Sequence, residues 1–158
     1  MKASDALVKK MEELGVEIVF GIPGGANLPL YDSLHDSEIR SVLVKHEQQA
    51  AHAAEGYARV KKRPGIALAT SGPGATNLIT GIVNASMDSA PLVAITGQVV
   101  RSFMGTDAFQ EADIVGMILP HVKYASVVFE SSKLVKEFVN AYRCAISGRT
   151  GRTLIDIP

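Results

Sequence analysis

Apolar side chains at the start of the chain recur at helical spacing and then give way to a short continuous apolar run. The spacing predicts a helix that Ser4 caps and Gly15 ends, with an apolar face made of Leu7, Val8, Met11 and Leu14. The run 16–21 is rich in β-branched residues and flanked by glycine, which is typical of a strand buried on both faces. The chain therefore opens with a helix followed by a buried strand.

The same step from helix to strand recurs along the rest of the chain. Further strands are predicted at 39–44, 66–70, 92–96, 125–129 and 153–157, and further helices at 27–34, 47–61, 75–86 and 132–147. Such alternation favours parallel strands that are joined by right-handed helical crossovers. We therefore expect an α/β fold with an open parallel sheet of about six strands and helices on both faces.

Four glycine-rich or polar segments directly follow predicted strands. They are Gly-Ile-Pro-Gly-Gly at 21–25, Lys-His-Glu at 45–47, Ser-Gly-Pro-Gly at 71–74, and Gly-Gln at 97–98 with a long loop behind it. In open parallel sheets ligands lie beyond the carboxyl ends of the strands, because helix amino termini and loops converge there. We expect these segments to form one ligand-binding edge.

The turn at 71–77, Ser-Gly-Pro-Gly-Ala-Thr-Asn, does not match the common phosphate-binding signatures. It lacks the lysine and second glycine of a Walker loop and the third glycine of a dinucleotide fingerprint. The next predicted strand ends at Gly97-Gln98, without an acid to bind a ribose. A Rossmann dehydrogenase is therefore the weaker hypothesis. A tight turn that only closes a crossover, and a plain hinge at 22–25, stay open as alternatives.

Glu47 opens the predicted helix 47–61, which is rich in alanine. An acid at this place complements the helix dipole for about 0.3 to 1 kcal/mol, and it can also serve a ligand whose binding tunes its proton. The alanines, together with Gly81 and Ala85 on the helix 75–86, form two faces of small side chains. These faces either meet another subunit or pack within the chain.

Composition excludes several classes of function. The 16 basic and 16 acidic residues form no long run of one sign, which argues against a nucleic-acid partner. Cys144 is the only cysteine and no Cys/His cluster has ligand spacing, so we expect no disulfide and no metal-ligating residue. No apolar run approaches the roughly 20 residues of a membrane span, and no signal peptide is evident, so a cytoplasmic protein is expected.

Six segments, in order along the chain, carry a family resemblance. They are 20–26 (FGIPGGA), 46–48 (HEQ), 54–59 (AEGYAR), 71–77 (SGPGATN), 87–91 (MDSAP) and 106–111 (TDAFQE). Together they resemble the pyrimidine-binding, amino-terminal domain of thiamine-diphosphate-dependent enzymes, most closely acetolactate (acetohydroxyacid) synthase large subunits. The resemblance covers essentially the whole chain. It implies the thiamine-diphosphate-binding fold and one pyrimidine-binding domain at 1–158, a fragment of a longer three-domain chain.

The resemblance also implies roles for individual residues. Glu47 is expected to bond N1′ of the aminopyrimidine, so that the cofactor's own 4′-imino group takes the C2 proton and leaves a thiamine ylide. The backbone N–H of Gly25 is expected to stabilise an oxyanion, while Phe109 and Gln110 face the substrate and Gln110 takes part in catalysis. The remaining cofactor-binding residues are expected to be Ile22, Pro23, Gly24, Pro73 and Asn77. Ile22 departs from the tyrosine often found at its position, which weakens assignment to one subfamily.

The activity implied by the resemblance is that of a transferase. The full enzyme would decarboxylate pyruvate and condense the two-carbon unit with a second 2-oxo acid, as in branched-chain amino-acid biosynthesis, whereas the isolated fragment is expected to be inactive. Thiamine diphosphate would be bound here by its pyrimidine half only, with Mg²⁺ and FAD held by domains absent from this chain. A pyruvate-oxidase-like enzyme, which shares the Phe-Gln pair, and a non-catalytic binding module of the same fold remain as alternatives.

Partners follow from the same resemblance. A homodimer or higher homo-oligomer is expected to form through the helices 47–61 and 75–86. The diphosphate-binding domain of a neighbouring subunit is expected to complete the active site. Whether a regulatory small subunit exists is left open.

Overall fold

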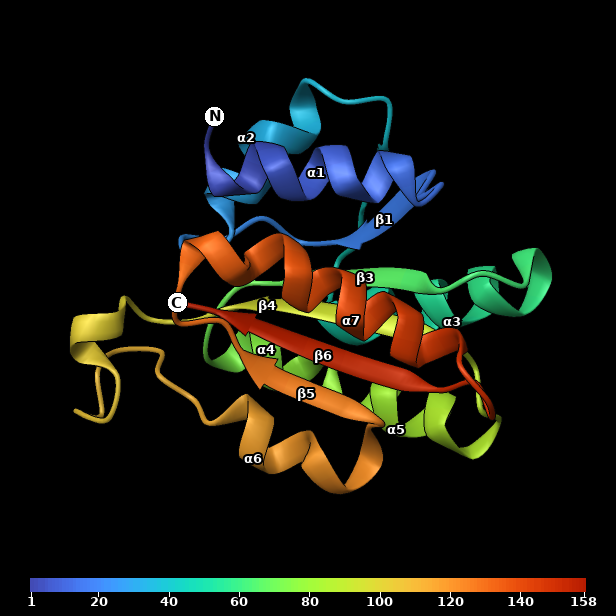
Figure 1. Ribbon diagram of the computed structural model, residues 1–158. Helices are drawn as coiled ribbons and strands as arrows, with labels where there is room; N and C mark the ends of the chain where they lie inside the picture. The colour runs from blue at the N-terminus through green and yellow to red at the C-terminus, as the bar shows by residue number, and fades with distance from the viewer.

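The core of the structure is one sheet of six strands in the order β2-β1-β3-β4-β6-β5, and every pairing is parallel (Figure 1). The computed structural model describes residues 1–158. The strands are β1 (Ile18–Gly21), β2 (Arg40–Leu43), β3 (Gly65–Ala69), β4 (Leu92–Gly97), β5 (Tyr124–Val127) and β6 (Arg152–Ile157). This confirms the predicted α/β class and the open parallel sheet.

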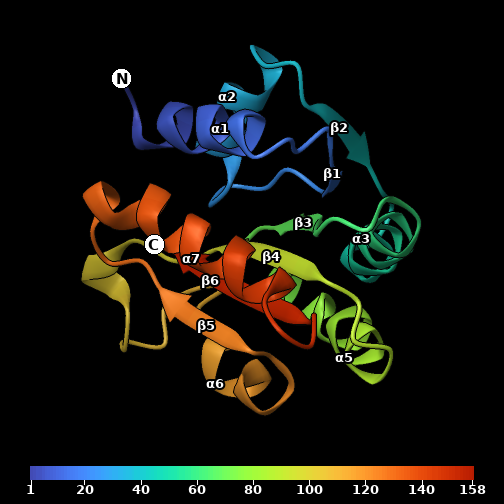
Figure 2. The same ribbon diagram turned by 45° about the vertical axis from the view of Figure 1, so that its right-hand side comes forward.

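Helices cover both faces of the sheet (Figure 1 and Figure 2). One face carries α1 (Ala3–Glu13), α2 (Leu28–His35) and α7 (Leu134–Ile146). The other carries α3 (Glu47–Lys61), α4 (Pro73–Asn77), α5 (Ile79–Met87) and α6 (Ile114–Ile118). Three short 3₁₀ turns occupy Arg101–Phe103, Leu119–His121 and Ser131–Lys133. None of these helices has both the length and the apolar character that crossing a bilayer requires.

The central strands are buried on both sides because their side chains feed two separate apolar cores. In β3, Ile66 and Leu68 pack under α1 and α7, whereas Ala67 and Ala69 pack under α3 and α5. Strand β4 alternates in the same way, and every residue of both strands is buried. Side chains of successive strand residues point to opposite faces, so continuous apolar runs are what a doubly covered parallel sheet needs.

Several predicted boundaries are wrong by a few residues. Ser4 does not cap α1: the helix begins at Ala3 after Lys2, whose N–H donates to the Asp5 carboxylate, and the Ser4 hydroxyl instead lies 2.8 Å from that of Ser33. The predicted helix 75–86 begins earlier and is divided into α4 and α5 at Leu78. Helix α6 was not predicted, because five residues are too few to display a helical period.

The small-residue faces of α3 and α5 are used within the chain. Ala50, Ala51 and Ala54 are fully buried, and a Cβ added to Gly81 would lie 2.4 Å from the Cβ of Ala51. The two helices therefore approach so closely that only glycine is accommodated at position 81. Of the two alternatives for these faces, packing within the chain is the one observed.

Gly81→Ala tests this close approach. The added methyl group would push α3 and α5 apart, and we expect the free energy of unfolding to fall by about 1 to 3 kcal/mol in urea titrations of the chain. Gly56→Ala is the matched control, because Gly56 is an exposed residue of α3 whose added Cβ would meet nothing within 4 Å. That change should stabilise the fold by about 0.5 to 1 kcal/mol. Equal effects at both positions would contradict the packing described.

Candidate functional site

Thr70, the residue that follows β3, is the point on which two glycine-rich turns converge. Its Oγ1 accepts the N–H of Ala26 at 3.2 Å. A Cβ on Gly24 would lie 2.6 Å from the Thr70 Cβ, and one on Gly74 would lie 2.8 Å from its Cγ2. The segments 21–25 and 71–74 are therefore brought together as predicted. Thr70 was not among the predicted site residues, although its place at the end of a buried strand, directly before the Ser-Gly-Pro-Gly turn, could have indicated it.

The turn between β1 and α2 is held by Asn27, which is buried. Its Oδ1 accepts the N–H of Gly24 at 2.7 Å, and its Nδ2 donates to the carbonyl of Ile22 at 3.1 Å. Gly25 between them is exposed, and its N–H makes no hydrogen bond within the chain. The turn thus presents one free backbone donor at the edge of the sheet.

Glu47 is the first residue of α3 and is half-buried. His46 caps this helix, since its Nδ1 accepts the N–H of Gln48 at 3.1 Å. The Oε2 atom of Glu47 accepts a hydrogen bond from Asn77 Nδ2 at 2.9 Å. The other oxygen, Oε1, has no hydrogen-bond partner in the chain and lies 3.2 Å from where a Cβ of Gly74 would be. Glu47 and Asn77, predicted for one site, therefore do lie together.

The loop after β4 brings Gln110 back to the same edge. Gln110 has a left-handed backbone (φ 62°), and a Cβ on Gly72 would lie 2.6 Å from its carbonyl oxygen. Its neighbour Phe109 is 89% exposed. The structure thus places the backbone of Gln110 against the 71–74 turn, while the ring of Phe109 contacts nothing that would cover it. The remaining predicted residues stand around the two turns, with Ile22 and Gly24 half-buried and Pro23 and Pro73 exposed.

The Glu111 side chain forms hydrogen bonds to the backbone of this loop. Its carboxylate accepts the N–H groups of Gly105 and, at 3.0 Å, Ala108. These backbone donors stabilise the ionised form and hold the pKa of Glu111 below its ordinary value. Sequence reasoning placed this glutamate in a motif without giving it a role.

Gln98 ties the same loop to the sheet. Its Nε2 donates to the carbonyl of Ala112 at 2.7 Å and to Asp156 Oδ2 at 3.0 Å, and the Thr96 hydroxyl donates to Asp156 Oδ1 at 2.6 Å. Burial raises the pKa of Asp156 to about 6, although both donors act in the opposite direction. The segment 97–98 therefore anchors the loop from the interior of the protein.

The family model described as thiamine pyrophosphate enzyme, N-terminal TPP binding domain, matches residues 1–117 of the chain. The chain belongs to this family. The matched part of this family member contains both glycine-rich turns, Glu47 and the loop with Gln110. The assignment confirms the resemblance predicted from the six motifs.

Curated relatives of this thiamine pyrophosphate enzyme domain align along the whole chain. It is 54% identical to the acetolactate synthase large subunit of Mycobacterium tuberculosis over 159 residues and 54% identical to that of Corynebacterium glutamicum over 159 residues. It is 47% identical over 158 residues to a probable acetolactate synthase large subunit of Methanocaldococcus jannaschii. The alignments cover 26%, 25% and 27% of these relatives, so the chain spans about a quarter of their length.

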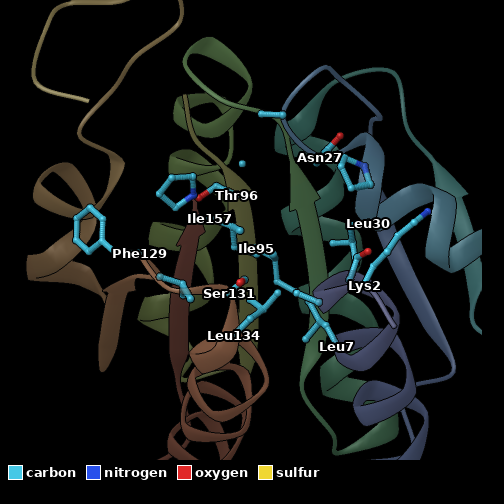
Figure 3. A pocket seen from close by; sticks show the side chains of 17 residues that line it. Lys2, Leu7, Asn27, Leu30, Ile95, Thr96, Phe129, Ser131, Leu134 and Ile157 are labelled. Atoms are coloured by element: carbon cyan, nitrogen blue, oxygen red, sulfur yellow. The ribbon is translucent and has the colours of Figure 1, made fainter. Parts of the chain in front are cut away.

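A cavity of about 480 Å³ lies on the other side of the β1–α2 turn, under α1, α2 and α7 (Figure 3). Its lining is mainly apolar and includes Leu7, Leu30 and Leu134, with Asn27 and Thr96 at the sheet edge. Neither Glu47 nor Gln110 lines it. No group of three or more His, Cys, Asp or Glu side chains is placed to hold a metal ion. The edge that carries Glu47 is thus separate from this cavity.

Lowering the pH should release the loop from Glu111. The bond to the backbone stabilises the loop while Glu111 is ionised and is lost as pH falls through the lowered pKa. In NMR titrations we expect the amide protons of Gly105 and Ala108 to shift together, with a midpoint below the ordinary glutamate value of 4.5. Glu111→Gln should abolish this common titration. A midpoint at or above the ordinary value would contradict the assignment.

Protonation of Asp156 should stabilise the fold, whereas protonation of Glu111 should weaken its loop. The folded pKa of Asp156 is raised from 3.8 to about 6, so the folded state gains stability as pH falls through that value. Relative to Asp156→Asn, we expect the unfolding free energy of the wild-type chain to rise by roughly 2 kcal/mol from about pH 7.5 to about pH 4.5. Urea titrations of both proteins across this range provide the measurement. Parallel pH profiles would rule the raised pKa out.

Proposed function

We propose that this chain forms the pyrimidine-binding wall of a thiamine-diphosphate site in a longer acetolactate synthase. The observation that carries the proposal is the Glu47 carboxylate, which has one oxygen held by Asn77 and the other free beside Gly74. A free carboxylate oxygen at a helix start suits a ring nitrogen that can share a proton with it. Membership of the thiamine pyrophosphate enzyme family supports that choice of ligand.

The residues around Glu47 fit an uncharged ring better than a diphosphate. The turns 22–26 and 71–77 consist of glycine, proline, alanine, isoleucine, serine, threonine and asparagine, with no cationic side chain among them. Without a Cβ, Gly74 leaves the Glu47 carboxylate uncrowded. Ile22, Pro23, Gly24 and Pro73 would line the ring. The diphosphate, with Mg²⁺, would be held by another domain.

The chain's own residues would perform three tasks. When bound, thiamine diphosphate supplies an acidic ring carbon that can be deprotonated to attack a keto group. Glu47 would hold a proton at Oε1 against N1′ of the pyrimidine, which makes the ring's amino group the base for that carbon. The free N–H of Gly25 would donate to an oxyanion that develops on the substrate. Phe109 and Gln110 would face the reacting carbons.

The whole protein would decarboxylate pyruvate and transfer the two-carbon unit to a second 2-oxo acid, as a cytoplasmic enzyme of branched-chain amino-acid biosynthesis that also carries FAD. The relatives that are named acetolactate synthases, about four times as long as this chain, support this reading over a pyruvate-oxidase-like one. Their greater length supports a longer chain, and we propose one pyrimidine-binding domain at 1–158 among three domains.

The proposed assembly is a homodimer or higher homo-oligomer, with the diphosphate-binding domain of a neighbouring subunit over the Glu47 edge. The loop after β4 supports such a cover, because Val100, Phe103 and Phe109 are 57%, 57% and 89% exposed there, and exposed apolar side chains gathered in one segment are typical of an interaction surface. Since the small-residue faces of α3 and α5 meet each other, the interface would use the outer sides of these helices. Val60 and Met87 are 80% and 76% exposed there.

Glu47→Gln in the full-length protein tests the proposal. Glutamine keeps the size of the side chain and cannot hold the proton, so hydrogen–deuterium exchange at C2 of bound thiamine diphosphate should slow by about 100-fold or more. NMR after rapid acid quench measures the exchange. Glu13→Gln, at the far end of α1, is the matched control and should leave the rate unchanged. Unchanged exchange in Glu47→Gln would remove Glu47 from this role and favour a non-catalytic binding module.

A further inference from the structure

Two asparagine–glutamate hydrogen bonds join α3 to the α4–α5 segment. Asn77 Nδ2 donates to Glu47 Oε2 at 2.9 Å, and Asn84 Nδ2 donates to Glu55 Oε2 at 2.7 Å. The two glutamates lie about two turns apart on α3, and the two asparagines are separated by a similar distance along the facing segment. Between the two pairs, Gly81 lets the helices touch at Ala51. The same kind of hydrogen bond therefore lies on either side of the contact between Gly81 and Ala51.

The two carboxylates differ in what balances their charge. The side chain of Glu55 is 5% exposed and accepts hydrogen bonds from Arg59, which also pairs with Asp88, the residue that follows α5. The His52 ring lies 3.7 Å from the Glu55 carboxylate. Both oxygens of Glu55 are thus engaged within the chain. The Glu47 carboxylate has no cationic partner, and the only hydrogen bond that it accepts comes from Asn77. The pair at Glu55 therefore joins the two helices with both oxygens engaged, whereas the pair at Glu47 leaves one carboxylate oxygen without a partner.

Asn77 restricts the orientation of the Glu47 carboxylate. The terminal torsion of a glutamate side chain is broad, so a carboxylate without partners samples many orientations. A donor on Oε2 fixes the plane of the carboxylate and thereby directs Oε1 past Gly74, where no side chain stands. An asparagine amide does this without a charge of its own, so it adds no second titrating group beside the first.

We infer that Asn77 is a positioning residue for Glu47, one that aims the free carboxylate oxygen at the ring instead of contacting the cofactor itself. The inference rests on the proposed function and refines it, because Asn77 then acts on the proton step and not on cofactor affinity. A residue that lined the pyrimidine would show the reverse pattern. The two roles are therefore separable by measurement.

The test is a double-mutant cycle in the full-length protein with Glu47→Gln and Asn77→Ala. Asn77→Ala should slow C2 exchange of bound thiamine diphosphate on the order of tenfold, the size expected for losing a hydrogen bond to a charged group, with its dissociation constant nearly unchanged. In the Glu47→Gln background, Asn77→Ala should slow exchange no further, because the group it positions is already inactive. Asn77→Ser, whose side chain is too short to reach Glu47, serves as a second variant if the alanine protein fails to fold.

Asn84→Ala is the matched control on the same helix pair. It should lower the thermal unfolding midpoint by breaking the hydrogen bond to Glu55, yet leave the exchange rate close to that of the wild-type protein. Equal slowing by Asn84→Ala would show that loosening of the helices suffices, and would overturn the inference.

The remaining outcomes distinguish the inference from the proposed function. Weaker cofactor binding caused by Asn77→Ala to the same extent in both backgrounds would mean that Asn77 touches the cofactor, against the inference. If Glu47→Gln slows exchange while both Asn77 variants exchange normally, the inference alone fails. If Glu47→Gln itself has no effect, the proposed function fails first.

Discussion

The candidate site depends on close approach of neighbouring segments to glycines, which have no side chain. Gly24 and Gly74 both press against Thr70, Gly72 lies under the carbonyl of Gln110, and a Cβ on Gly97 would lie 2.6 Å from that of Ala26. Because the strands are parallel, their carboxyl ends meet at one edge, and the loops that leave them compete for the same space. Glycine leaves room for these close approaches, and residues that are distant in sequence therefore lie together at this edge.

A similar close approach joins the helices that carry Glu47 and Asn77. Alanine and glycine let α3 and α5 pack in direct contact, and this contact brings Asn77 within 2.9 Å of Glu47. At the other end, the Glu55–Arg59 pair balances a buried carboxylate, which would be costly to leave alone. Helix α3 thus carries Glu55, whose two carboxylate oxygens both have partners, and Glu47, with only one partnered oxygen. That difference separates a structural contact from a candidate reactive group.

Much of the fold was predictable, because the signals that specify it are local. Continuous β-branched and apolar runs marked the central strands β3 and β4, and glycine or proline marked where they end. The site residues were predicted through their motifs, and Glu47, Asn77 and the two turns do lie together. Thr70, Asn27 and Glu111 were not found as contributors, since each acts through hydrogen bonds to backbone atoms that no sequence pattern displays.

The sequence by itself determined the class of the fold, the edge of the sheet at which the glycine-rich turns meet and the family to which the chain belongs, because periodicity and motif spacing are properties of residue order. Only the tertiary structure decided that the small-residue faces meet within the chain, that Asn77 bonds Glu47, and that Glu111 and Gln98 hold the long loop. These contacts depend on distances between segments far apart in the sequence. Such distances are set by how the helices pack on the two faces of the sheet.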